Sequence, residues 1–181
     1  AMGAAFLIFS NDCEDGTDTL LDALDAAGII RHMRTPEGEK PPQWRALKAA
    51  EGLLDAEWVL HLDCDEFFNL RAPLQSFEDL IGVLPEGADA VALRWRLFGH
   101  ADRTVTGEGL TMERFTEAAS ETCALPLTWF FKSLHRADRF QKAGAHRPRQ
   151  KKGAVPRWVN GSGASLPEEF AADEGRINLW G

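Results

Sequence analysis

The sequence has few cysteines, no long apolar run and fewer positive than negative charges. Its three cysteines, Cys13, Cys64 and Cys123, are widely spaced and form no C-x-x-C pair. That spacing argues against a disulfide framework and a zinc knuckle, and it favours a reducing compartment. No apolar run approaches the ~20 residues needed to cross a bilayer, and no signal peptide is visible. We therefore predict a cytoplasmic protein without a transmembrane segment, either in the cytosol or at the inner face of the membrane.

The charge balance excludes one large class of partners. Lysine and arginine number 20 against 28 aspartates and glutamates, for a net charge of −8. An acidic protein repels the phosphate backbone, so we expect no nucleic-acid partner. The chain also lacks a glycine-rich phosphate loop of the Walker type. With 181 residues, 44% of them hydrophobic, the chain is long enough for one well-packed domain and short for two, and we predict a single domain over residues 1–181.

The most informative stretch is an apolar run at 58–62 that stops at three acids, Asp63, Asp65 and Glu66. A run of this length is typical of a strand buried on both faces of a parallel sheet, and ligands of such sheets gather beyond the carboxyl ends of the strands. Asp63 and Asp65 are two residues apart, so on extended backbone both point to one side. Paired carboxylates suit Mg²⁺ or Mn²⁺ shared with substrate phosphates. The alternative is that the acids only mark the return of the chain to water.

Strand and helix patterns alternate along the first third of the chain. Apolar strand patterns at 5–9, 29–33 and 58–62 are separated by helical patterns at about 17–27 and 43–55. This order predicts an α/β fold, with a mostly parallel, Rossmann-like sheet flanked by helices. Further strands are expected at 88–95, 127–134 and 139–144, with a helix at 77–84 and a long loop at about 99–109.

Two polar segments could bind a ligand or have a purely local role. The turn after the first strand contains Asn11, Asp12, Glu14 and Asp15. Capping of the next helix accounts for one or two of these acids, and a ligand at the end of the strand would account for the rest. The basic segment 146–152 is either a solvated surface loop or a clamp for phosphate near the acidic site.

Taken together and in order, these pieces resemble the bacterial family-2-like glycosyltransferases of the GT-A fold. The resemblance covers roughly residues 6–163, and the ordered set is more specific than the D-x-D-E-F piece alone. It rests on the polar turn at 10–18, Pro42 and Gln43 at a helix start, the acids and phenylalanine of 63–67, the segment 95–99, Phe131 and Lys132, and the segment 146–148.

The resemblance implies a site for a nucleoside-diphosphate sugar and a glycan or other hydroxyl acceptor, as in polysaccharide biosynthesis. It implies that nucleotide-sugar contacts come from Asn11, Asp12, Asp15, Gln43, Asp63 and Lys132. It implies that Mn²⁺ or Mg²⁺ is held by Asp63 and Asp65, with His146 as a later ligand. For the general base, the candidates are Glu66 and Glu117, with Glu113 beside the latter.

The chain also departs from that family. An extra strand and polar turn usually precede the strand found here at 5–9, and they form part of the nucleotide pocket. We therefore expect a form truncated at both ends, and two alternatives to a glycosyltransferase stay open. One is a non-catalytic nucleotide- or carbohydrate-binding remnant of the same fold. The other is a different metal-dependent phosphoryl enzyme, such as a nucleotidyltransferase or hydrolase.

Overall fold

The structure is a computed structural model that describes residues 3–100, 102, 107 and 109–179. Its N-terminal part is a parallel pair of short strands, β1 (Leu7–Ser10) and β2 (Arg31–Arg34), joined through the helix α1 (Thr17–Ala26). The helix α2 (Pro42–Ala50) follows and begins at the proline, whose fixed φ suits the first turn of a helix.

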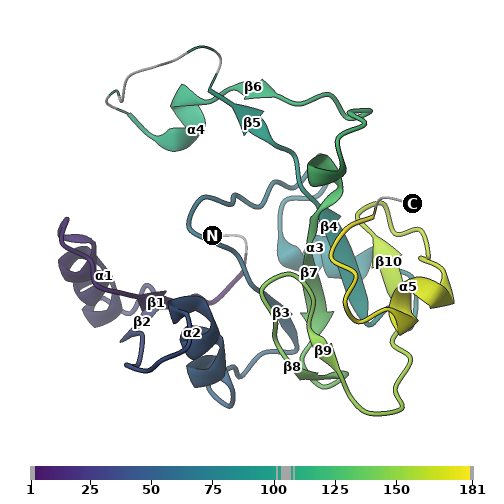
Figure 1. Cartoon of the computed structure of the whole chain (residues 1–181), viewed down its shortest axis with the longest axis horizontal. Coiled ribbons are helices and arrows are strands. Elements are labelled where there is room, and N and C mark those ends of the chain that lie inside the picture. The colour runs from purple at the N-terminus through teal and green to yellow at the C-terminus, as the bar shows by residue number, and fades with distance from the viewer. Residues whose placement is uncertain (1–2, 101, 103–106, 108, 180–181) are drawn as a thin grey trace.

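A four-stranded mixed sheet forms the centre of the molecule (Figure 1). Its strands lie in the order β10 (Trp158–Asn160), β4 (Ala90–Arg94), β7 (Phe131–Arg136) and β3 (Trp58–Leu60). Strand β7 runs antiparallel to both of its neighbours, and only β10 and β4 pair in parallel.

Shorter elements surround this sheet. Figure 1 shows that the segment from β5 to β6 projects away from it. The shorter elements around the sheet are α3 (Phe77–Gly82), β5 (Phe98–Gly99), α4 (Thr111–Arg114), β6 (Glu117–Ala118), the 3-10 helix η1 (Pro126–Trp129), β8 (Phe140–Lys142), β9 (Arg149–Gln150) and α5 (Glu168–Ala172).

The prediction of a mostly parallel, Rossmann-like sheet flanked by helices was wrong. The strand that precedes the three acids, β3, pairs antiparallel with β7 and is only half-buried, and the parallel pair of β1 and β2 is a separate two-stranded sheet. Helices α1 and α2 have no fully buried residue, so they do not cover a large sheet face. The periodicities located the N-terminal helices and strands approximately, but strand pairing depends on contacts between distant segments, which local periodicity does not encode. The loop expected at 99–109 lies partly outside the described residues.

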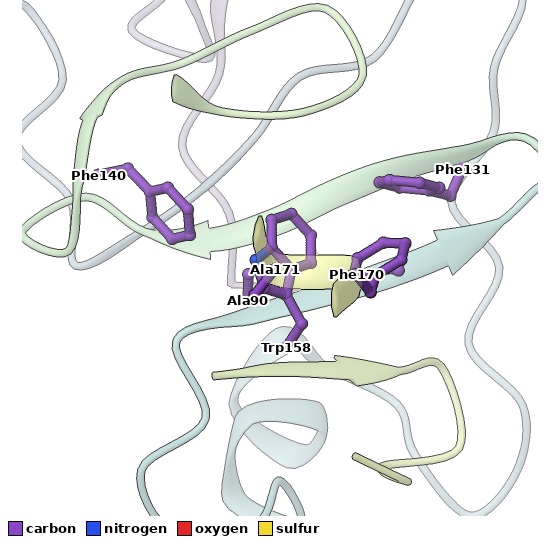
Figure 2. Packing of buried hydrophobic residues seen from close by; sticks show 7 residues of the cluster. Ala90, Phe131, Phe140, Trp158, Phe170 and Ala171 are labelled. Carbon is purple, nitrogen blue, oxygen red and sulfur yellow. The ribbon is translucent and has the colours of Figure 1, made fainter. Parts of the chain in front are cut away.

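Apolar side chains cover both faces of the four-stranded sheet. Alternation along β4 sends Ala90 and Ala92 to one face and Val91 to the other. The first face packs against α5 and carries the aromatic cluster in Figure 2, where Phe131, Trp158 and Phe170 meet at centroid distances between 5.4 and 6.1 Å. The second face packs against α3. Trp58 and Leu60 of β3 pack against the buried residues of this second face.

The start of α3 matches the sequence pattern well. Ser76 and Asp79 form a complete capping box at the start of α3, where each side chain accepts a hydrogen bond from the other residue's backbone N–H. Among the described residues, no helix combines the length and the apolar character needed to cross a membrane.

Candidate functional site

The most connected polar cluster of the sheet region lies just beyond β3 and centres on Asp63. The Lys132 ammonium donates a hydrogen bond to Asp63 Oδ2 at 2.7 Å and lies 3.2 Å from Glu66 Oε2. The ammonium also donates to the carbonyl of Ala145, at 2.8 Å. A single ammonium therefore sits between two carboxylates and one backbone carbonyl.

The second oxygen of Asp63 faces a different pair of side chains. Gln43, at the start of α2, donates from Nε2 to Asp63 Oδ1 at 2.7 Å. His61 Nε2 lies 3.3 Å from the same oxygen. Both oxygens of Asp63 are thus in contact with protein groups, and α2 is tied to the end of β3 through its second residue.

The sheet explains how these distant residues meet. Leu60, the last residue of β3, is paired with Leu134 of β7, and the strands are antiparallel. Asp63 continues beyond β3 while Lys132 lies two residues before Leu134, so both occupy the same end of the strand pair. The side chain of Lys132 is only 3% exposed, and that of Asp63 is 36% exposed. The cluster therefore has a buried cation beneath a partly accessible carboxylate.

The charges in the cluster shift the pKa values of its members. Partial burial raises the pKa of the Asp63 carboxyl, but the hydrogen bond and charge of Lys132, together with His61, hold it below its ordinary value. Burial lowers the pKa of His61, and the positive charge of Lys132 lowers it further. At neutral pH Asp63 is therefore ionised and His61 is neutral.

Glu66 has one engaged and one unengaged oxygen. Its Oε2 accepts a hydrogen bond from the backbone N–H of Asp63 at 2.8 Å, besides its contact with Lys132. Its Oε1 is buried, with no hydrogen-bond partner among the described residues. Buried polar atoms are normally paired, and Glu66 Oε1 is an exception: it is an unpaired acceptor inside the cluster.

The predicted metal ligands are only partly gathered. Asp63 lies in the cluster, whereas Asp65 is exposed in the loop that follows it. The His146 ring packs against Trp95 and Phe130, and its Nδ1 lies 3.1 Å from the carbonyl of Phe131. Among the residues that the structure describes, no group of three or more His, Cys, Asp or Glu could hold a metal ion. Two carboxylates can hold Mg²⁺ or Mn²⁺ when substrate phosphates and water supply the remaining ligands, and in this structure Lys132 and Gln43 contact the two oxygens of Asp63.

The polar turn after β1 lies at the N-terminal pair of strands. The Asn11 side chain donates to Asp12 at 2.8 Å and accepts from Arg45 of α2 at 3.3 Å, so the turn and α2 are linked directly. Asp12 has a positive φ of 49°, a conformation that aspartate tolerates in turns. Asp15 accepts from the backbone N–H of Thr17 at 3.0 Å, so its carboxylate engages the first residue of α1, while the N-cap residue itself is Gly16.

The other two base candidates lie in the projecting β5–β6 segment. Glu117 is exposed on β6, where its partner in the ladder is Gly99. The Glu113 side chain accepts from the backbone N–H of Leu110 and caps α4. Among the described residues, neither has a hydrogen bond or ion pair with the Asp63 cluster, whereas Glu66 is part of it.

Sequence reasoning missed two groups of the cluster, His61 and the carbonyl of Ala145. The spacing of His61 and Asp63, two residues apart on extended backbone, is a signal that would have placed both on one side. For the Ala145 carbonyl there was no signal, because any residue offers one. An open groove of about 470 Å³ lies along α2 beside Trp44 and Lys48 and is not lined by Asp63 or Lys132. We give the Asp63 cluster more weight, because its polar side chains converge on one carboxylate.

Comparisons with known proteins add no family assignment. No protein-family model matches this chain, and neither the curated proteins nor the solved structures contain a match to it.

Proposed function

We propose that this chain carries the donor-sugar site of a metal-dependent glycosyltransferase, which moves a sugar from a nucleoside diphosphate to an acceptor hydroxyl. The observation that supports the proposal best is the partly exposed Asp63, which is held by Gln43, His61 and Lys132 from separate segments at one end of β3. The proposal rests on this site and on the sequence resemblance, and not on the sheet topology.

In this proposal Asp63 and Asp65 hold Mg²⁺ or Mn²⁺ together with the diphosphate of the donor. The bound ion would supply Lewis-acid stabilisation of the leaving diphosphate. Lys132 contacts Asp63 directly, and its ammonium offers electrostatic stabilisation to the same negative charge. Gln43 and His61 keep the Asp63 carboxylate in one orientation.

Glu66 is the base candidate that lies nearest to this chemistry. Transfer with inversion requires a carboxylate that accepts the proton of the acceptor hydroxyl. The unpaired Oε1 of Glu66 is such an acceptor, and the bond from Asp63 N–H to Oε2 fixes the carboxylate plane. Because Oε1 is buried, a role as base requires the acceptor hydroxyl to approach from inside the cluster.

One observation favours a second candidate, the non-catalytic binding remnant. Both oxygens of Asp63 already contact protein groups, with Lys132 at 2.7 Å in the place where a cation would otherwise neutralise the acid. A site whose carboxylate is already paired with protein groups can still bind a nucleotide without forming a catalytic metal site.

Product analysis separates the candidates. The folded protein is incubated with uridine- and guanosine-diphosphate sugars, Mn²⁺ and a mixture of simple glycoside acceptors. Release of a nucleoside diphosphate, abolished in Asp63→Ala and Asp65→Ala but retained in the exposed control Asp55→Ala, supports glycosyl transfer. Release of inorganic phosphate or pyrophosphate points to a phosphoryl enzyme, and binding without any product points to the remnant. Either of these two results would overturn the proposal.

A further inference from the structure

A second cluster, on the N-terminal pair of strands, has the connectivity of a nucleophile, a base and an orienting acid. Ser10 Oγ, at the end of β1, lies 2.9 Å from His32 Nε2 on β2. The other ring nitrogen, His32 Nδ1, lies 2.8 Å from Asp22 Oδ1 on α1. Within the described part of the chain, none of these residues has a hydrogen bond or ion pair with the Asp63 cluster, so the proposed donor site leaves them unused.

The hydrogen bonds fix the direction in which a proton can move. Hydrogen bonds from Arg34 and His32 lower the pKa of Asp22 to about 2, so this carboxylate is ionised and can only accept. In the neutral ring the proton that faces this carboxylate lies on Nδ1, and Nε2 is left as an acceptor, with the Ser10 hydroxyl at 2.9 Å and Arg34 Nη1 at 3.1 Å as its neighbouring donors. The backbone N–H of His32 also donates to Asp25 at 3.1 Å, which holds the residue in place.

Arg34 is a permanent hydrogen-bond donor that lies beside the same carboxylate and imidazole. Its guanidinium pairs with Asp22 at 2.8 Å and with Asp18 at 3.2 Å, and its Nη1 lies 3.1 Å from both ring nitrogens of His32. The charge of Asp22 is thereby balanced, while its Oδ1 remains in contact with the imidazole.

We propose that Ser10, His32 and Asp22 form a nucleophilic relay that cleaves esters with a small acyl group. Ser10 Oγ would attack the ester carbonyl while His32 Nε2 takes the hydroxyl proton, and Asp22 would orient the imidazolium. The bond from the carbonyl carbon to the leaving alkoxide breaks, and that alkoxide takes the proton from His32. Water then attacks the acyl-serine by the reverse proton path and releases the acid and Ser10. No cofactor is needed.

Burial sets the size of the substrate. Ser10 is 5% exposed and the His32 side chain is 1% exposed, whereas that of Asp22 is 58% exposed. Because the hydroxyl is nearly buried, the proposal is restricted to the smallest acyl groups, such as acetyl. The same burial is compatible with a purely structural tie between β1, β2 and α1, and the experiment must distinguish the two roles.

The test uses p-nitrophenyl acetate, whose hydrolysis is followed by absorbance and whose acetyl adduct on the protein is located by acid quenching and peptide mass spectrometry. We expect a covalent adduct on Ser10 in the wild type and none at that position in Ser10→Ala. Ser133→Ala is the matched control, because Ser133 is equally buried but donates to the carbonyl of His146 at 2.5 Å, and it should be labelled on Ser10 like the wild type. A folded wild type without an adduct on Ser10, or hydrolysis unchanged in Ser10→Ala, would overturn the proposal.

A second pair of variants tests the relay itself. Asp22→Asn and Asp18→Asn each remove a carboxylate that pairs with Arg34, but only Asp22 contacts His32. We expect Asp22→Asn to slow hydrolysis by about 100-fold and Asp18→Asn by less than about twofold. Equal effects of the two variants would mean that Asp22 acts through Arg34, which contradicts the relay. Nucleotide binding at Asp63 is measured separately and should be unaffected by Ser10→Ala.

Discussion

Lys132 and Asp63 lie 69 residues apart in the sequence, yet the lysine ammonium is 2.7 Å from a carboxylate oxygen of the aspartate. The pair joins β7 to the loop after β3, and Glu66 shares the same cation at 3.2 Å. A nearly buried lysine with two acidic partners is costly to build, since each charge loses water on folding. Such an arrangement should therefore respond sharply when one partner is removed.

Lys132→Met is the direct test of that arrangement. Without the ammonium, Asp63 and Glu66 would face each other uncompensated, and the Ala145 carbonyl would lose its donor. We expect the free energy of unfolding to fall by about 3 kcal/mol, the lower end for a broken buried pair because Asp63 is partly exposed. The measurement is urea denaturation at neutral pH.

The matched control is Lys48→Met, which removes the lysine of an exposed pair with Glu51. It should change the stability by less than about 0.5 kcal/mol. Similar small losses in both variants would show that the Lys132 contacts contribute little to stability.

His135 should make the fold sensitive to mild acid. It is 3% exposed on β7, edge-on to Phe140, and burial lowers its pKa to about 4. In the unfolded chain a histidine binds its proton near pH 6.5, so below that pH the unfolded state takes up protons that the native state refuses. Stability from this group is present at pH 7 and falls as the pH drops from about 6.5 towards 4.

We expect the wild type to lose about 2 kcal/mol more between pH 7 and pH 5 than His135→Leu does, measured by urea denaturation at both pH values. His100→Leu is the control, because His100 is exposed, and its pH dependence should match the wild type. The same slope in all three proteins would refute the assignment.

Arg147 is expected to hold the C-terminal helix in place. It is buried, its guanidinium lies 4.4 Å from the Trp158 ring and 4.6 Å from the Phe170 ring, and it donates to the carbonyls of Phe170 and Ala171. Burial also lowers its pKa to about 10. Arg147→Met should lower the free energy of unfolding by about 2–4 kcal/mol, because the Phe170 carbonyl loses its side-chain donor and the Ala171 carbonyl keeps only Gln150. Arg149→Met, at an exposed site on β9, should cost less than about 0.5 kcal/mol.

The sequence predicted local features better than long-range ones. Pro42 and the Ser76–Asp79 capping box mark helix starts that depend on neighbouring residues alone, and the structure has both. The pairing of β3 with β7 was not predicted, because nothing in either strand's periodicity names its partner. The expectation of one parallel sheet failed for that reason.

The same division applies to the candidate site. The acids after β3 were identified from their position, and Lys132 was singled out only through the resemblance to a family. The basic segment was expected to be either solvated or a phosphate clamp, yet Arg147 points into the aromatic core, where backbone carbonyls take the place of an anion. The sequence of a basic segment does not indicate which of its charged side chains is buried.

The account is tested most directly by calorimetric titration of uridine diphosphate and guanosine diphosphate into the folded protein, with Mn²⁺ and then with a chelator. A donor site at Asp63 predicts binding of at least one nucleotide that requires Mn²⁺, is lost in Asp65→Ala and is retained in Asp55→Ala. No binding of either nucleotide to the folded protein, or binding that persists in chelator and in Asp65→Ala, would contradict it.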